Sequence, residues 1–436
     1  MIMVRRGGSN RSGPTSVFDG VKNSLRSRTS GAAILSGALL TALALAGCGT
    51  ASSFGGTASG TGGATSSSAA PTTPAAAGHS ATASPAATVA VPPAGGPVPG
   101  GFAATSVTFV SPREAFVLGT APCSHAPCTS IVRTLDRGAS WRGLPAPVVP
   151  LGQPASITGP AVWGIRFATP AHGFVFGNGL WETTDDGEHW ARAAAPAGSI
   201  LSLEVIDGQV LALTVSCDVT NGCAPGATLQ HRPLSGGGWQ RVTGLRVSGP
   251  EQDLIATQAR VAAVLNGTTV IVTTDGGLST AVRSTPCTTE GVAVAQSVAV
   301  TSPDSLALLC AGQGAMGSVG KTVYLSGDLG RHWTKAGSAP NGGDPIRLAA
   351  PTPGQLVVSA ASGASWLYYS GDGAARWGTA YQVGDGGVGF NDLGFTTTSD
   401  GVVVYAPARS DGNTDRRPGR LLLTSNGGAT WQAVRF

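Results

Sequence analysis

One short pattern recurs along the chain and constrains its fold more than any other feature. It reads Ser/Thr-x-Asp-x-Gly-x-x-Trp, and clear copies end at Trp141, Trp190, Trp333 and Trp431, the last with Asn426 in place of Asp. Weaker copies occupy 235–239, 273–280 (without a Trp) and 370–377. Neighbouring copies are roughly 48 residues apart, and seven such units need 336 residues, against 335 in the segment 102–436. A fixed period of this length indicates a repeat architecture of seven units.

Each unit predicts four short strands. Upstream of the pattern lie two apolar runs joined by a Pro, Gly or Asp turn, as in 107–119, 165–177 and 393–405. A third run leads into the pattern and a fourth starts at its Trp. Four antiparallel strands repeated seven times predict an all-β, seven-bladed β-propeller. Composition agrees, since 65 Gly, 29 Pro and only 11% charged residues suit short strands and tight turns rather than a helical bundle.

The recurring pattern itself predicts a turn, not a reaction centre. Its Asp and Ser/Thr side chains can bond backbone amides of the turn, its Gly tolerates positive φ, and its Trp packs against neighbouring strands. We therefore assign only a structural role to these positions, and nominate no catalytic residue and no metal ligand among them. The residues in question are Asp136, Trp141, Asp185, Trp190, Asp328, Trp333, Asp372, Trp377 and Trp431.

These turns and the upstream strand pairs resemble the BNR/Asp-box propellers of the sialidase superfamily fold. That group includes sialidases, xyloglucan hydrolases, the sortilin ectodomain and the photosystem II stability/assembly factor-like proteins. Seven blades and the Gly-Phe-Val-Phe-Gly element at 173–177 are most similar to the assembly-factor-like branch. The resemblance covers residues 102–436 and implies a fold rather than a function, because unrelated activities share this ring.

The residues of a sialidase site are not recognisable. Such a site needs three arginines, a Tyr nucleophile with a Glu partner, and an acidic Asp. None of the five tyrosines has a Glu nearby in sequence. Arginines occupy comparable first-strand positions only at Arg166 and Arg347, where we expect exposed strand ends. We therefore expect no glycosidase activity. A catalytic pair of carboxylates from distant parts of the chain is the alternative that the sequence leaves open.

The N-terminal hundred residues predict export and tethering. Residues 1–47 combine a basic start with an apolar run at 32–46, which is typical of a signal peptide. The run ends in Leu-Ala-Gly-Cys, which resembles a bacterial lipobox and predicts a lipid on Cys48. Residues 49–100 contain no charged side chain, and are mostly Ala, Gly, Ser, Thr and Pro. We expect 48–101 to be a disordered tether.

The remaining six cysteines predict disulfides, as an even number does in an exported chain. They fall into three neighbouring pairs, Cys123–Cys128, Cys217–Cys223 and Cys287–Cys310. A zinc site using His125 lacks a second Cys/His pair. A calcium loop at 411–415 has Arg416 where Gly is needed. No cofactor or metal is expected.

Charge and aromatic content limit the partners. Six of the 27 basic residues and one of the 23 acidic residues precede Cys48, which leaves 21 basic and 22 acidic. This balance argues against nucleic acid. We expect a lipoprotein on the outer face of the bacterial membrane whose propeller is a non-catalytic binding or assembly module for a protein partner. The alternative is a polysaccharide-binding protein or a sialidase-like glycoside hydrolase. Trp163, Trp181 and Trp366 could line a sugar-binding face, but packing between blades is the favoured interpretation.

Overall fold

The computed structural model describes residues 95–126, 128–152, 159–218, 222–243, 245, 254–257, 260–288, 293–386, 388–405 and 419–436. All of them belong to one compact unit, Ala86–Phe436. The predicted signal peptide, Cys48, the tether up to residue 94 and the calcium-like stretch 411–415 lie outside the described residues.

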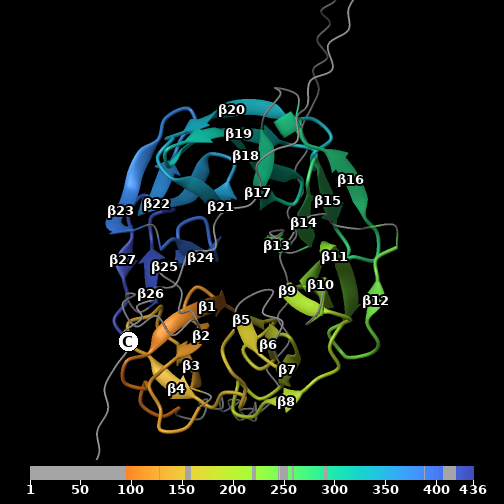
Figure 1. The fold of residues 1–436 in the computed structure, drawn as a ribbon, viewed down its shortest axis with the longest axis vertical. Helices are drawn as coiled ribbons and strands as arrows, with labels where there is room; N and C mark the ends of the chain where they lie inside the picture. The colour runs from red at the N-terminus through yellow and green to blue at the C-terminus, as the bar shows by residue number, and fades with distance from the viewer. Residues whose placement is uncertain are drawn as a thin grey trace, which may run out of the picture. The chain divides into compact units, whose positions relative to one another are not determined.

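Seven antiparallel sheets stand around a centre as blades, which confirms the seven-bladed propeller (Figure 1). The first strand of each blade is innermost and the last strand lies at the rim. Blades one and two contain β1 (Ala103–Phe109), β2 (Ala115–Thr120), β3 (Thr129–Thr134), β4 (Arg142–Leu144), β5 (Val162–Phe167), β6 (Gly173–Gly177), β7 (Leu180–Thr183) and β8 (Ala191–Arg192). Blades three and four contain β9 (Ser199–Ile206), β10 (Gln209–Asp218), β11 (Gly222–Pro233), β12 (Gln240–Arg241), β13 (Leu254–Thr257), β14 (Val261–Asn266), β15 (Thr269–Thr273) and β16 (Ala281–Ser284).

Blades five to seven complete the ring. A short 3-10 helix, η1 (Pro286–Thr288), precedes blade five. The strands of these blades are β17 (Val294–Ser302), β18 (Ser305–Ala315), β19 (Ser318–Ser326), β20 (Thr334–Ala339), β21 (Asp344–Thr352), β22 (Gln355–Ser370), β23 (Gly378–Gly386), β24 (Phe390–Phe395), β25 (Gly401–Tyr405), β26 (Arg420–Thr424) and β27 (Gln432–Ala433).

Blade six has three assigned strands where the sequence predicted four. The start of β22 pairs with β21 from Gln355 to Ala361, and its end pairs with β23 from Gly363 to Tyr369. Gly363 has φ +58°, a backbone conformation that suits a reversal of direction. The two halves of β22 thus take the places of the second and third strands of the other blades.

The core lies between blades, which explains the unbroken apolar runs of the second strands. Both faces of a blade pack against a neighbour, so every residue of β6 and β25 is buried. Rim strands such as β8 and β27 are two residues long and exposed. One apolar cluster thus joins each pair of adjacent blades, as between blades four and five and between blades five and six.

The ring closes without strand exchange, because all four strands of blade seven come from residues 390–433. Val402, Val404 and Leu421 of blade seven share a core cluster with blade one. The C-terminal Phe436 packs edge-on against Phe102 at a ring-centroid distance of 4.9 Å. Blades one and seven are therefore joined mainly by side chains.

The propeller's contacts begin before residue 102, where the sequence predicted the propeller to start. The amide of Gly143 on β4 donates to the carbonyl of Gly96 at 2.9 Å, and Val98 packs on the blade one core. Residues 96–98 thus extend the rim of blade one.

Candidate functional site

The repeat turns have the hydrogen bonds that the sequence predicted. In blade two, Asp185 Oδ1 accepts from the amide of His189 at 3.0 Å, and Thr183 Oγ1 accepts from the amide of Gly187 at 3.1 Å. The His189 ring bonds Asp185 Oδ2, and these bonds lower the pKa of Asp185. Because both oxygens are used within the turn, this aspartate is a structural group. Equivalent amide bonds join Asp136 to Ser140, Asp275 to Ser279, Asp328 to His332, Asp372 to Arg376 and Asn426 to Thr430.

The tryptophans that end these turns act in two ways. The indole N–H of Trp141 donates to Gly138 of its own turn, and Trp377 and Trp431 do the same in their blades. Trp190 instead donates to the carbonyl of Pro145, which follows the preceding blade. Trp239 and Trp333 bond Ala194 and Ser284 in the same way. These three residues therefore tie neighbouring blades together.

The inner strands bring together a set of charged and polar side chains that we call the central arginine cluster: Ser106, Arg166, Glu204 and Asp392. They come from β1, β5, β9 and β24. Arg166 Nε donates to Glu204 Oε1 at 2.8 Å, and Nη2 donates to Asp392 Oδ1 at 3.0 Å. Nη1 donates to the carbonyl of Ile165 at 2.8 Å. One guanidinium thus links blades two, three and seven.

Asp392 closes the joint between the last blade and the first. Its Oδ2 accepts from Ser106 Oγ at 2.5 Å and from the amide of Val107 at 2.9 Å. At two other joints a serine hydroxyl accepts from the backbone amide of the next blade. Ser106 Oγ accepts from the amide of Ile165, and Ser297 Oγ accepts from the amide of Leu348. A carboxylate therefore replaces the hydroxyl acceptor at the closing joint, where it also attracts Arg166.

Asp392 lies in a bulge of β24, between Asn391 and Gly394. Its φ is +47°, a conformation that non-glycine residues rarely adopt. The surrounding hydrogen bonds hold the carboxylate in this backbone conformation, which aims it at blades one and two.

The two carboxylates of the cluster are not equivalent. Burial opposes ionisation of Asp392, but the Arg166 charge and the bonds from Ser106 and Val107 together lower its pKa. Glu204 has Arg166 as its donor and must share that cation with Asp392. Burial, with a contribution from the Asp392 charge, raises the pKa of Glu204. One cation thus compensates Asp392 well and Glu204 incompletely, while the pKa of Arg166 is raised further above its usual value.

Sequence reasoning found only part of this cluster. The expectation that Arg166 is an exposed strand end was wrong, because its side chain is 19% exposed and paired with two carboxylates. Arg347 lies on β21 and does not belong to the cluster; it is half-buried. Glu204 and Asp392 were missed. The signal that could have found them is a charged residue within the mostly apolar first strand of a blade. No motif or spacing in the sequence marks these two positions.

The three tryptophans outside the turns pack between blades, which is the interpretation that the sequence favoured. Trp163 is 5% exposed in the core between blades two and three. Trp181 packs on the core between blades one and two, and Trp366 on the core between blades five and six. Every Trp, Tyr and Phe that the structure describes is buried or half-buried.

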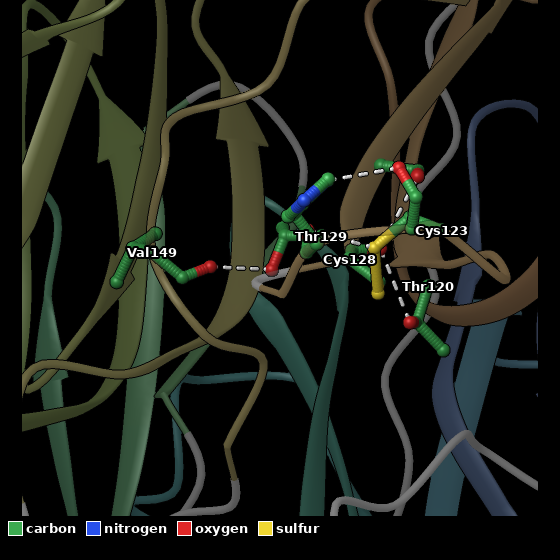
Figure 2. The surroundings of a disulfide bond; sticks show 8 residues. Thr120, Cys123, Cys128, Thr129 and Val149 are labelled. Atoms are coloured by element: carbon green, nitrogen blue, oxygen red, sulfur yellow. Dashed lines mark hydrogen bonds between the residues drawn. A yellow bond between two sulfur atoms is a disulfide. The ribbon is translucent and has the colours of Figure 1, made fainter.

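Disulfides lie at one end of the ring, opposite the repeat turns, because second-to-third-strand loops and blade connections share that end. Cys123–Cys128 closes the β2–β3 loop, where Thr120 Oγ1 donates to the Cys128 carbonyl (Figure 2). Cys287–Cys310 joins η1 to β18. These two of the three predicted pairs are confirmed. Strand register places Cys217 opposite Cys223, and Cys217 is disulfide-bonded, while the Cys223 side chain lies outside the described residues.

No group of three His, Cys, Asp or Glu side chains in the described residues is arranged to hold a metal ion. Over the same residues, the structure contains no helix with the length and apolar character needed to cross a membrane.

No family model matches the chain, and none of the curated proteins matches it. Solved structures with a similar fold include YCF48 bound to a D1 peptide, with 14% identity over 75% of this chain and 91% of that chain, and a TM-score of 0.48. An ancestral GH74 enzyme has 14% identity, and the match covers 79% of this chain and 46% of that chain, with a TM-score of 0.45. Oligogalacturonate lyase from Vibrio parahaemolyticus has 8% identity, and the match covers 74% of this chain and 91% of that chain, with a TM-score of 0.49.

Proposed function

We propose that this propeller is a non-catalytic module of the BNR/Asp-box type that binds a protein partner, displayed on the outer face of a bacterial membrane by a lipid on Cys48. The observation that carries the binding proposal is the rim of blade six. There β23 ends its sheet and is nine residues long. The rim strands of blades one to four and seven have two to four residues.

A free strand edge recognises a peptide backbone, because it offers a row of N–H and C=O groups at strand spacing. Lys and Pro are among the residues that protect such edges, and β23 (Gly-Thr-Ala-Tyr-Gln-Val-Gly-Asp-Gly) contains neither; its one charged residue, Asp385, lies near its end. Gly378 and Gly384 face open space, so the chain of a partner can approach closely. A glycan has no matching ladder of donors and acceptors. The edge therefore favours an extended segment of a protein.

The central arginine cluster supports the absence of catalysis. A glycoside hydrolase needs a carboxylic acid that reaches the leaving oxygen and a second carboxylate opposite it. Here Glu204 and Asp392 both bond Arg166, and all three nitrogens of that guanidinium donate within the protein. Arg166 is therefore occupied and is not available to bind the carboxylate of a sialoside.

The placement of the aromatic residues argues against a carbohydrate partner. Sugar-binding surfaces use exposed aromatic faces, on which the apolar side of a sugar ring stacks. Trp163 is buried, and Trp366 is stacked with Tyr368 at a ring-centroid distance of 6.4 Å.

Two assays test these statements with the full chain in detergent. We expect no turnover of sialosides, xyloglucan or galacturonans, and no retention on a panel of cell-envelope glycans. Turnover that Glu204→Gln abolishes would establish the hydrolase alternative, and specific glycan retention would establish the polysaccharide-binding one.

Mass spectrometry of the mature chain tests the lipid anchor. It is expected to find a lipidated N-terminal Cys48, and an unmodified Cys48 would refute the anchor.

A further inference from the structure

Lys321 lies on β19 in blade five, far in sequence from the central arginine cluster, and only 1% of it is exposed. Its ammonium is surrounded by backbone carbonyl oxygens. The distances from Nζ are 3.1 Å to Val319, 3.0 Å to Pro340, 2.8 Å to Asn341, 3.0 Å to Gly342 and 2.6 Å to Gly343. We call these five oxygens the carbonyl cage.

Four of the five oxygens belong to residues 340–343, which connect β20 of blade five to β21 of blade six. Independent bonds hold this connection in place. Its Asn341 carbonyl accepts from the amide of Val319 at 2.9 Å, and the amide of Gly343 donates to Gly317 at 2.9 Å. Tyr368 donates its hydroxyl to Gly342 at 3.1 Å, from blade six. The cage is therefore a built part of the junction between these blades.

The arrangement is that of a coordinated cation rather than of an ordinary lysine. An ammonium has three N–H donors, whereas five carbonyls converge on it here. Rings of backbone carbonyls replace the hydration shell of monovalent cations in selective channels. All five oxygens are neutral, all five distances exceed the range of about 2.0–2.1 Å for Mg²⁺, and four of them exceed the range of about 2.3–2.6 Å for Ca²⁺. The cage chemistry therefore suits a singly charged ion.

We propose that the carbonyl cage is a monovalent-cation site that Lys321 fills from within the chain, so that the blade five to blade six junction needs a positive charge at this point. Burial lowers the pKa of Lys321 to about 8, while Asp344 opposes that shift, so the ammonium remains charged at neutral pH. The Tyr368 ring, whose centroid lies 5.9 Å from Nζ, adds a further favourable contact for a cation.

Cation rescue of two variants in the full chain tests this proposal. Lys321→Ala removes the charge and leaves space, and we expect its Tm to fall by roughly 5 to 10 °C. Potassium, ammonium or propylammonium should restore at least half of that loss, whereas tetramethylammonium at equal ionic strength should not. Lys321→Met removes the charge but keeps the stem, so its loss should not be restored by any of these cations.

The chain provides a matched control in Lys335, an exposed lysine on β20. Lys335→Ala should lower the Tm far less than Lys321→Ala does, and should gain no cation dependence. If Lys321→Ala does not fold in plain buffer, the proposal expects it to fold when potassium or propylammonium is added. Equal response to all cations, or no response to any, would overturn the proposal. So would acetylation of wild-type Lys321 at pH 7 as fast as that of Lys335.

Discussion

Arg166 and Asp392 are 226 residues apart in the chain, yet Nη2 of the arginine lies 3.0 Å from Oδ1 of the aspartate. Asp392 belongs to the last blade, and it also bonds the first blade through Ser106 and Val107. Arg166 extends this connection into blade two. The ion pair thus spans the joint at which the two ends of the repeat meet, and it supplements the apolar packing that closes the ring.

Arg166→Met should destabilise the ring by about 3 kcal/mol, because it leaves Glu204 and Asp392 partly buried without their cation. The matched control is Arg137→Met, since Arg137 pairs with Asp400 across the same joint but is 53% exposed. That change should cost less than about 1 kcal/mol. Urea unfolding followed by Trp fluorescence measures both. Equal effects of the two substitutions would show that the central arginine cluster does not close the ring.

Glu204→Gln should alter how stability depends on pH. The folded-state pKa of Glu204 is raised, so between about pH 4.3 and that higher value the folded state binds more protons than the unfolded state. Wild-type stability therefore falls as pH rises through this window. The Glu204→Gln variant lacks this pH dependence, because glutamine does not titrate. Urea unfolding of both proteins at a series of pH values from 4.5 upward should show the wild type losing stability relative to Glu204→Gln until the pH passes the raised pKa of Glu204. A constant difference would contradict the assignment.

Thr273→Val tests the repeat turn of blade four. Thr273 is 3% exposed, and its Oγ1 accepts from the buried amide of Gly277 at 2.8 Å. Valine has the same shape but no acceptor, so the amide loses its partner at a cost of about 1–3 kcal/mol. Ser279→Ala, at the exposed end of the same turn, should cost less. Thermal unfolding compares the two, and a Thr273→Val variant as stable as wild type would contradict the structural role of the turn.

The disulfides should differ in their contribution. Cys287 and Cys310 are 23 residues apart, whereas Cys123 and Cys128 are 5 apart. Loop-closure entropy predicts losses of about 3 and about 2 kcal/mol when each pair is replaced by alanines. Cys287 and Cys310 are also each only 1% exposed, so replacing them with alanines adds a loss of core packing. Calorimetry of the two double variants should rank them in this order, and the reverse order would indicate that loop length does not govern their effect.

The sequence was sufficient for the number of blades, the strand order and the chemistry of the repeat turns, because these depend on local patterns such as Thr183-x-Asp185. The pairing of Cys287 with Cys310 was also predictable, because the six cysteines fall into three neighbouring pairs along the chain. The central arginine cluster was not. Arg166, Glu204 and Asp392 share no motif, and their meeting depends on the closure of the whole ring.

Other features were hidden for different reasons. Lys321 belongs to no motif, and the carbonyls of residues 340–343 that surround its ammonium come from a connection between two blades. In blade six the second and third strands run together as β22 around Gly363, although Ser362-Gly363 is a turn-forming pair in the sequence. The contact of Gly96 with Gly143 on β4 lies in a Pro/Gly-rich stretch that carries no strand signal in the sequence.

Photo-crosslinking in living cells tests the central claim, that the rim of blade six binds a protein. A photoreactive phenylalanine analogue replaces Gln382 on β23 in the full chain, and Gln432 on the two-residue strand β27 in the matched control; both glutamines are exposed. Irradiation should give a discrete protein adduct from position 382 that Thr379→Lys on the same strand removes, and none from position 432. Equal adducts from both positions, or no protein adduct from position 382, would contradict the proposed function.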